Sequence, residues 1–148
     1  MLVDGDDVHV VSGFTGATVL KSTGSEFWGF PRDRYTTLAE TKDRILATSV
    51  TAWWRWTSPD VDVEARYPVV KDLLLSTFAQ VHSLALQHTI FEMGRAVLEA
   101  CGDVAEVRLS CPNKHHVLVD LEPFGLENPG EVFHAADRPY GLIEAEVR

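Results

Sequence analysis

The sequence predicts an α+β domain in which an antiparallel four-stranded sheet carries two helices on one face. Strand-like alternation of apolar and polar residues marks the first and last parts of the chain, and helical spacing of apolar residues marks the middle. The resulting order of two strands, two helices and two strands places both helices on the same face of the sheet. A chain of 148 residues has the length of one domain, so residues 1–148 are predicted to fold as a single unit.

The N-terminal part predicts strands before a long irregular loop. Residues 8–11 are rich in valine and indicate a strand, residues 13–16 a glycine-bounded turn, and residues 18–20 a partner strand. After the loop, residues 36–44 begin with a hydroxyl side chain and continue with good helix formers. They predict a short helix that ends just before the next strand.

Residues 45–56 form the strongest predicted strand, because β-branched and aromatic residues fill most of its positions. Side chains of a strand point alternately to its two faces. One face is apolar and consists of Leu46, Thr48, Val50, Ala52, Trp54 and Trp56. The other face is mixed and carries Trp53, so we expect both faces of this sheet to be covered, one by helices and one by neighbouring subunits.

Residues 67–101 predict two helices separated by a break. Apolar residues recur three and four positions apart, at Val70, Leu73, Leu74, Thr77, Phe78 and Val81, and again at Ile90, Phe91, Gly94, Val97 and Leu98. The pattern is weakest in residues 82–88, where the break is expected. Gly102 and Asp103 predict the end of the second helix.

Two further strands are predicted after the helices. Residues 104–109 and 117–121 alternate in polarity, and the segment Ser-Cys-Pro-Asn-Lys-His separates them. From residue 122 the chain carries proline, glycine and asparagine, and we expect it to be irregular as far as residue 141.

Composition limits the classes of partner. The formal net charge of −9 argues against nucleic acid or an anionic membrane surface, although a local arginine can still bind a small anion inside a cleft. The sequence contains no apolar run long enough to span a membrane. The two cysteines, Cys101 and Cys111, are predicted to be free thiols in a reducing cytoplasm. The C-terminal Glu-Val-Arg differs from a peroxisomal address, which favours a bacterial cytoplasm.

An unusual concentration of aromatic residues lies in the loop before residue 45. Phe27, Trp28 and Phe30 are followed by several arginines, the last of them Arg44. Aromatic faces stack on flat rings, and guanidinium groups grip planar carbonyls and anions at two points. The pattern therefore suggests a site for a flat, polar, anionic heterocycle. The alternative is an aromatic plug that only packs under a long loop.

Two further groups of polar residues could complete such a site. Asn113 and His115 lie two positions apart and would share a face, whereas His115 and His116 would point to opposite faces. This argues against a metal site formed by the two histidines, and a solvated polar hairpin is the structural alternative. Gln87 lies at the break between the helices, where its amide offers a donor and an acceptor to a purine-like edge; the alternative is a solvated glutamine.

Three segments together resemble the urate oxidase (uricase) family. They are TVLKSTGSEFWGF with RDRYTTLAETKDRILATSV, SCPNKHHVLVDL, and AADRPYGLIEAEV, and they occur in the family's order over nearly the whole chain. The resemblance covers only the C-terminal half of a uricase, which carries two tandem tunnelling-fold modules. It implies that the sheet joins others edge to edge into a barrel with the helices outside.

The resemblance implies a reaction and a set of site residues. The family oxidises urate with dioxygen to 5-hydroxyisourate and hydrogen peroxide in purine catabolism, as a cofactor-independent oxidoreductase without a metal. By resemblance, Phe27 stacks on urate, Arg44 and Gln87 grip it from opposite sides, and Leu38 and Leu86 form walls of the pocket. Asn113 would lie beside the ring face where oxygen or water acts, and His115 would belong to a proton relay. Ala85 stands where relatives often carry serine.

The resemblance also implies partners outside this chain. The relay of the family is completed by a lysine and a threonine from the N-terminal module of a neighbouring subunit, and complete subunits form a homotetramer. We therefore expect this chain to carry most of the binding pocket and only part of the catalytic residues. The alternative is a non-catalytic module that only binds a purine or only builds an oligomer.

Overall fold

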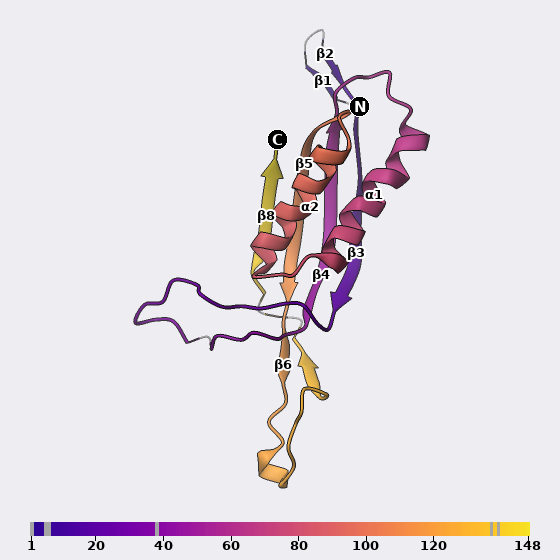
Figure 1. Cartoon of the computed structure of the whole chain (residues 1–148). Coiled ribbons are helices and arrows are strands. Elements are labelled where there is room, and N and C mark those ends of the chain that lie inside the picture. The colour runs from indigo at the N-terminus through magenta and orange to yellow at the C-terminus, as the bar shows by residue number, and fades with distance from the viewer. Residues whose placement is uncertain (1, 5–6, 38, 137, 139) are drawn as a thin grey trace.

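The structure, a computed structural model, describes residues 2–4, 7–37, 39–136, 138 and 140–148 (Figure 1). Four antiparallel strands form its main sheet in the order β3-β4-β5-β8. Their bounds are β3 (Val11–Lys21), β4 (Leu46–Trp56), β5 (Val104–Lys114) and β8 (Leu142–Val147). Two helices, α1 (Val63–Gln80) and α2 (Leu86–Ala100), lie side by side on one face of this sheet. The predicted α+β class with two helices on one face is confirmed.

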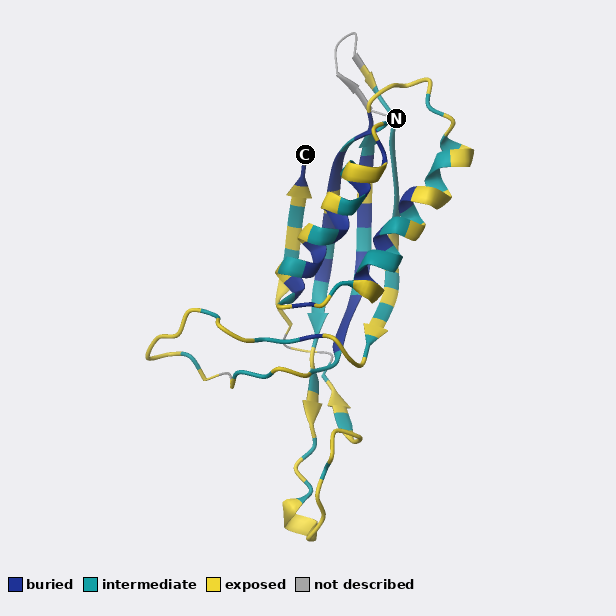
Figure 2. Cartoon of the chain, in the orientation of Figure 1, coloured by how far each residue is buried: buried dark blue, intermediate teal, exposed yellow. Residues whose placement is uncertain are grey.

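The core lies between the helices and the sheet, where Figure 2 shows the buried residues gathered. β4 is central, and its predicted apolar face is the buried one, with Trp54 and Trp56 almost fully enclosed. Facing side chains come from both helices: Val70, Leu74 and Phe78 of α1, and Ile90, Met93 and Val97 of α2. The break between the helices falls at residues 81–85, which overlap the predicted interval 82–88, and we call this segment the linker.

Gly94 brings α2 unusually close to β8. A Cβ atom at this position would lie 2.6 Å from Cγ2 of Val147, which is less than van der Waals contact. We therefore expect Gly94→Ala to destabilise the fold. Overpacking costs about 1–3 kcal/mol, and the better helix propensity of alanine offsets roughly 1 kcal/mol of it.

The midpoint of urea unfolding measures this effect. Gly102→Ala serves as the control, because a Cβ atom there meets nothing within 4 Å. A Gly94→Ala variant that is more stable than the parent chain, by the roughly 1 kcal/mol that helix propensity alone provides, would contradict the close approach of α2 and β8.

The predicted turn at residues 13–16 is wrong. β3 runs without interruption through these residues, and the pairing with β4 instead shifts register between Phe14 and Ala17. Gly16 adopts a left-handed φ of 69° at this bulge, a conformation that glycine adopts without steric cost. The glycines thus bend one long strand. Two short strands, β1 (Leu2–Asp4) and β2 (Asp7–His9), pair before it.

The structure also differs from the prediction in the fourth strand of the sheet. β5 continues through the segment predicted to separate two strands, and β8 rather than residues 117–121 pairs with its far side. Part of residues 117–121 belongs to β6 (His116–Leu118), which pairs with β7 (Phe133–Ala135). Together with the short 3₁₀ helix η1 (Glu122–Phe124), residues 116–135 form a projecting arm (Figure 1).

The described residues of the 36–44 segment form no helix, so that prediction is wrong as well. Asp33 and Thr36 close a tight turn, in which the Thr36 hydroxyl accepts from the Asp33 N–H at 2.9 Å. Thr41 exchanges two backbone hydrogen bonds with Phe27, at 2.8 and 3.0 Å. This bridge takes an N–H that a helix would need, and the described residues of 22–45 form one long loop; we call residues 22–45 the aromatic loop.

The face of the sheet opposite the helices is open. Trp53 lies on it with 41% of its surface exposed. A hollow of about 560 Å³ runs along this face, lined by Trp53, Arg55, Glu106, Arg108 and Glu144 among others. Among the described residues, no helix is both long and apolar enough to cross a membrane.

Candidate functional site

The antiparallel topology brings the predicted site segments to one end of the sheet. β3 ends and β4 begins at this end, so both ends of the aromatic loop lie there. β5 also ends there, with Asn113 near its terminus, and the linker between α1 and α2 lies at the same end. Figure 1 shows the aromatic loop and the arm leaving the body from this end. Segments far apart in sequence therefore converge on one region.

Backbone hydrogen bonds fasten the aromatic loop to the linker. Ser25 and Ser83 form a parallel bridge, in which the Glu26 N–H donates to the Ser83 carbonyl at 2.6 Å. The Ser83 N–H donates in turn to the Gly24 carbonyl at 2.8 Å. The Arg44 N–H donates to the Ser25 carbonyl at 3.0 Å, so the two ends of the loop are also joined.

The aromatic residues of the loop divide into a stacked pair and an exposed ring. Phe27 and Phe30 stack with centroids 4.3 Å apart and planes 20° from parallel, and both are half-buried. Trp28 is exposed, with the Lys42 ammonium 4.6 Å from its centroid. The Phe30 ring therefore covers one face of Phe27, the packing that an aromatic plug would show, and a flat ligand would have to stack on the other face.

Arg44 is held beside Phe27 with much of its donor capacity left over. Its guanidinium carbon lies 5.3 Å from the Phe27 centroid, and its Nε donates to the Glu26 carbonyl at 3.1 Å. Within the described residues, its two terminal nitrogens make no hydrogen bond, so their N–H groups remain for a planar ligand. Burial lowers the pKa of Arg44 by desolvation, but an arginine stays charged at neutral pH.

The beginning of α2 lacks a side-chain cap. Within the described residues, its N-cap residue, Ala85, makes no side-chain capping bond to the N–H groups of the first turn. The positive end of the helix dipole favours an anion at this place. Gln87, the second residue of α2, is exposed, whereas Leu86 as a whole residue is 1% exposed and belongs to the core. The place of Leu86 in the pocket wall therefore stays a prediction.

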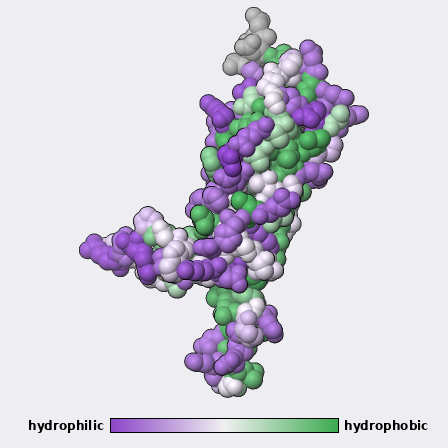
Figure 3. All heavy atoms as spheres, in the orientation of Figure 1, coloured by the Kyte–Doolittle hydropathy of each residue, from purple (hydrophilic) through white to green (hydrophobic). Residues whose placement is uncertain are grey.

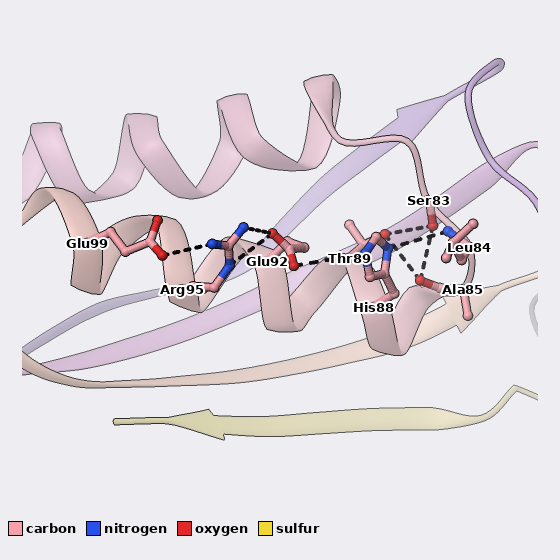
Figure 4. A network of polar contacts seen from close by, with 8 residues as sticks. All are labelled: Ser83, Leu84, Ala85, His88, Thr89, Glu92, Arg95 and Glu99. Carbon is pink, nitrogen blue, oxygen red and sulfur yellow. Dashed lines mark hydrogen bonds and ion pairs between the residues drawn. The ribbon is translucent and has the colours of Figure 1, made fainter.

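Hydroxyl groups fix the linker against this helix end. The buried Thr89 hydroxyl donates to Ser83 Oγ at 2.7 Å, and Ser83 Oγ donates to the Ala85 carbonyl at 3.1 Å. Figure 4 shows these contacts at one end of α2 and, farther along it, Arg95 between Glu92 and Glu99. The end of α2 that carries Gln87 is thus well ordered by its own polar contacts.

Asn113 and His115 lie at the end of β5, next to the other site segments. Asn113 pairs with Thr48 of β4, whose side chain is on the helix-covered face, so Asn113 points to the same face as the linker. His115 follows the strand and is exposed. His116 turns back, with Nδ1 3.2 Å from the Lys114 carbonyl oxygen. In the part of the chain that is described, no three metal-ligating side chains come together.

Leu38 lies outside the described residues, so its proposed place in the pocket wall stays a prediction. The hollow on the open sheet face is lined by none of Phe27, Arg44, Gln87, Asn113 or His115. The candidate site is identified by the segments with aromatic and polar side chains that meet at one end of the sheet, and not by the volume of a hollow.

Sequence reasoning missed the residues that join the segments of the site. Glu26 and His82 are 56 positions apart, yet Glu26 Oε1 lies 2.6 Å from His82 Nε2. Lys21 Nζ donates to the carbonyl of Val81, and burial lowers the pKa of this lysine. No local pattern in the sequence signals either contact, because each depends on the packing of the loop against the linker.

Comparison with known families and proteins gives consistent matches. The family model described as Uricase matches residues 10–144. The uricase of Arthrobacter globiformis is 61% identical over 146 residues, which cover 99% of this chain and 48% of that protein. The uricase of Aspergillus flavus is 40% identical over 161 residues, which cover 99% of this chain and 53% of the relative.

Solved structures agree with the sequence comparisons. The crystal structure of the Arthrobacter globiformis uricase superposes with a TM-score of 0.96 and covers 99% of this chain and 51% of that one. A uricase from Bacillus fastidious, 28% identical, gives a TM-score of 0.78 over 93% of this chain and 44% of that one. The chain thus spans about half the length of the curated relatives it matches.

Proposed function

The chain belongs to the uricase family, and from this premise we propose that it supplies most of the urate-binding surface of a urate oxidase. A tunnelling-fold module equivalent to the N-terminal half of the relatives would complete the active site. This proposal rests mainly on one observation. The aromatic loop, the start of α2 and the end of β5 all lie at one end of the sheet.

Binding would depend on stacking and on charge-assisted hydrogen bonds. Phe27 would stack on the flat ring of the urate anion. The free terminal nitrogens of Arg44 would grip one edge at two points, and the Gln87 amide would pair with the opposite edge. The uncapped start of α2 would add backbone donors and a favourable dipole for the anion.

The reaction would transfer two electrons from urate to dioxygen. Urate, dioxygen and water give 5-hydroxyisourate and hydrogen peroxide, so dioxygen takes two electrons and two protons while water supplies the new hydroxyl group. Asn113 would face the side of the ring where dioxygen or water acts, and His115 would carry protons. The protein would contribute orientation, electrostatic complementarity and proton transfer, without a metal or an organic cofactor.

The full assembly is proposed to be a homotetramer of complete subunits in a bacterial cytoplasm. The open sheet face with the exposed Trp53 needs a cover, which edge-to-edge assembly into a barrel would supply. Cys101 and Cys111 are both free and buried, which fits a reducing compartment.

An oxygen electrode and a peroxide assay test this function together. We expect the enzyme assembled with an N-terminal module to consume one dioxygen and release one hydrogen peroxide for each urate, at a rate that EDTA leaves unchanged. Urate binding without peroxide release would favour the alternative, a non-catalytic purine-binding module. Loss of turnover with EDTA, restored by one metal ion, would contradict the cofactor-free reaction and indicate His115 and His116 as ligands.

A further inference from the structure

Glu26 makes three contacts that join the aromatic loop to its surroundings. Its N–H donates to the Ser83 carbonyl at 2.6 Å, and its own carbonyl accepts from Arg44 Nε at 3.1 Å. Its carboxylate lies 2.6 Å from Nε2 of His82, in the linker. One residue thus contacts the guanidinium group of the site through its backbone and the linker through both backbone and side chain.

We propose that Glu26 and His82 form a positioning pair that fixes Arg44 relative to Gln87. This inference rests on the proposed function, in which those two side chains grip opposite edges of urate. His82 lies in the linker that leads directly into α2 and Gln87, and the Glu26 carbonyl oxygen accepts a hydrogen bond from Arg44. Neither member of the pair needs to touch the substrate.

The physical need for such a pair follows from the lengths of the segments that it joins. The aromatic loop connects β3 to β4 through 24 residues, 22–45, whereas a two-point grip on a planar ligand tolerates displacements of only about 0.5 Å. The linker is fastened at Val81 by Lys21 and at Ser83 by the loop backbone. The Glu26–His82 contact adds a side-chain connection between these two anchors.

The exposure of Glu26 and His82 predicts that their contact affects only the loop and the linker. The His82 side chain is 58% exposed and that of Glu26 is 23% exposed, so their contact contributes little to global stability. An imidazole can donate from Nε2 in its neutral form as well as when protonated, so the bond does not require a charged histidine. Its loss should therefore loosen the loop and the linker without unfolding the sheet.

Amide hydrogen exchange on this chain tests the local effect. We expect His82→Ala to raise the exchange rates of the Glu26, Ser83 and Arg44 amides about two- to fivefold, as expected for an exposed ion pair. Amides that pair β4 with β5 should keep their rates. Glu99→Ala is the matched control, because Glu99 is also a paired surface carboxylate but lies at the far end of α2. Unchanged exchange at the three amides in His82→Ala would overturn the proposal.

Steady-state kinetics of the enzyme assembled with its N-terminal module test the consequence for the site. We expect His82→Ala and Glu26→Ala each to raise the KM for urate several-fold while kcat changes less than twofold. The double variant should be no worse than either single variant, because both remove the same contact. His82→Gln, which keeps an amide donor, should recover part of the affinity. Multiplicative effects of the two substitutions, or a loss confined to kcat, would contradict a shared positioning role.

The two experiments separate this inference from the function on which it rests. If the parent enzyme fails to oxidise urate, the proposed function is wrong, and the exchange rates alone decide whether the pair holds the loop against the linker. If the parent enzyme is active and both variants keep its KM, the positioning role is wrong and the proposed function stands.

Discussion

Arg44→Ala is expected to abolish measurable urate binding by the assembled enzyme. Its terminal nitrogens are the uncommitted charged donors beside Phe27, and their two hydrogen bonds to a urate anion would be largely shielded from water. Removing one partner of such a contact costs about 2–5 kcal/mol, which weakens binding roughly thirtyfold or more. Calorimetry without oxygen measures binding while preventing turnover.

Two further variants separate the charge of Arg44 from its shape. Arg44→Lys keeps a positive charge but lacks the planar pair of donors, so we expect intermediate affinity. Arg34→Ala is the matched control, since Arg34 belongs to the same loop and is exposed beside Tyr35, 4.7 Å from its ring centroid. If a folded Arg44→Ala variant binds urate with the affinity of the parent enzyme, the assignment of Arg44 to the urate-binding site is wrong.

Mixing this chain with a separately produced N-terminal uricase module is expected to create activity that neither has alone. The proposed site residues in this chain bind and orient urate, but the lysine and threonine expected to complete the relay belong to the other module. Urate absorbance should therefore stay nearly constant with either module alone and should fall when the two modules are mixed. The effect is all or none, because the proton relay would be interrupted in either part.

The control for this experiment is a mixture that contains the Arg44→Ala variant, which should stay inactive at micromolar urate. Full turnover by this chain alone would show that its own residues complete the relay. Lys21 would then be examined first, because its ammonium is partly buried near the linker.

Local patterns predicted the elements whose packing is regular. The alternation in residues 45–56 identified both the strand and its buried face, since Trp54 and Trp56 are enclosed and Trp53 is exposed. The helical spacing and the weak segment at residues 82–88 likewise predicted two helices and their break. In these elements, the periodicity of the backbone and the burial of one face lead to the same answer.

Elements set by long-range pairing could not be predicted in this way. Residues 36–44 have good helix propensity, but the bridge between Phe27 and Thr41 draws them into an extended loop. Glycines that indicate a turn instead form a bulge at Gly16, because β4 offers a partner along the whole strand. The choice of β8 rather than residues 117–121 as the fourth strand depends on which segment reaches the free edge of β5.

The candidate site, like the fold, could be predicted only where it depends on local sequence patterns. The types and spacing of Phe27, Arg44 and Asn113 suggested a place for a flat anion, and the topology brings their segments to one end of the sheet. The contact between Glu26 and His82 is invisible in sequence, because it joins a loop and a linker that have no periodic pattern.

The order of elements along the chain has a consequence for biosynthesis. β4 pairs with β5, as Ala47 with Lys114, although both helices lie between these strands in sequence. Closing such a distant pair makes folding slower than the roughly microsecond-to-millisecond range of helical bundles. On the ribosome, the apolar face of β4 emerges before the helices that cover it. Until α2 has been synthesised, the nascent chain therefore exposes the tryptophan-rich strand that later becomes the centre of its core.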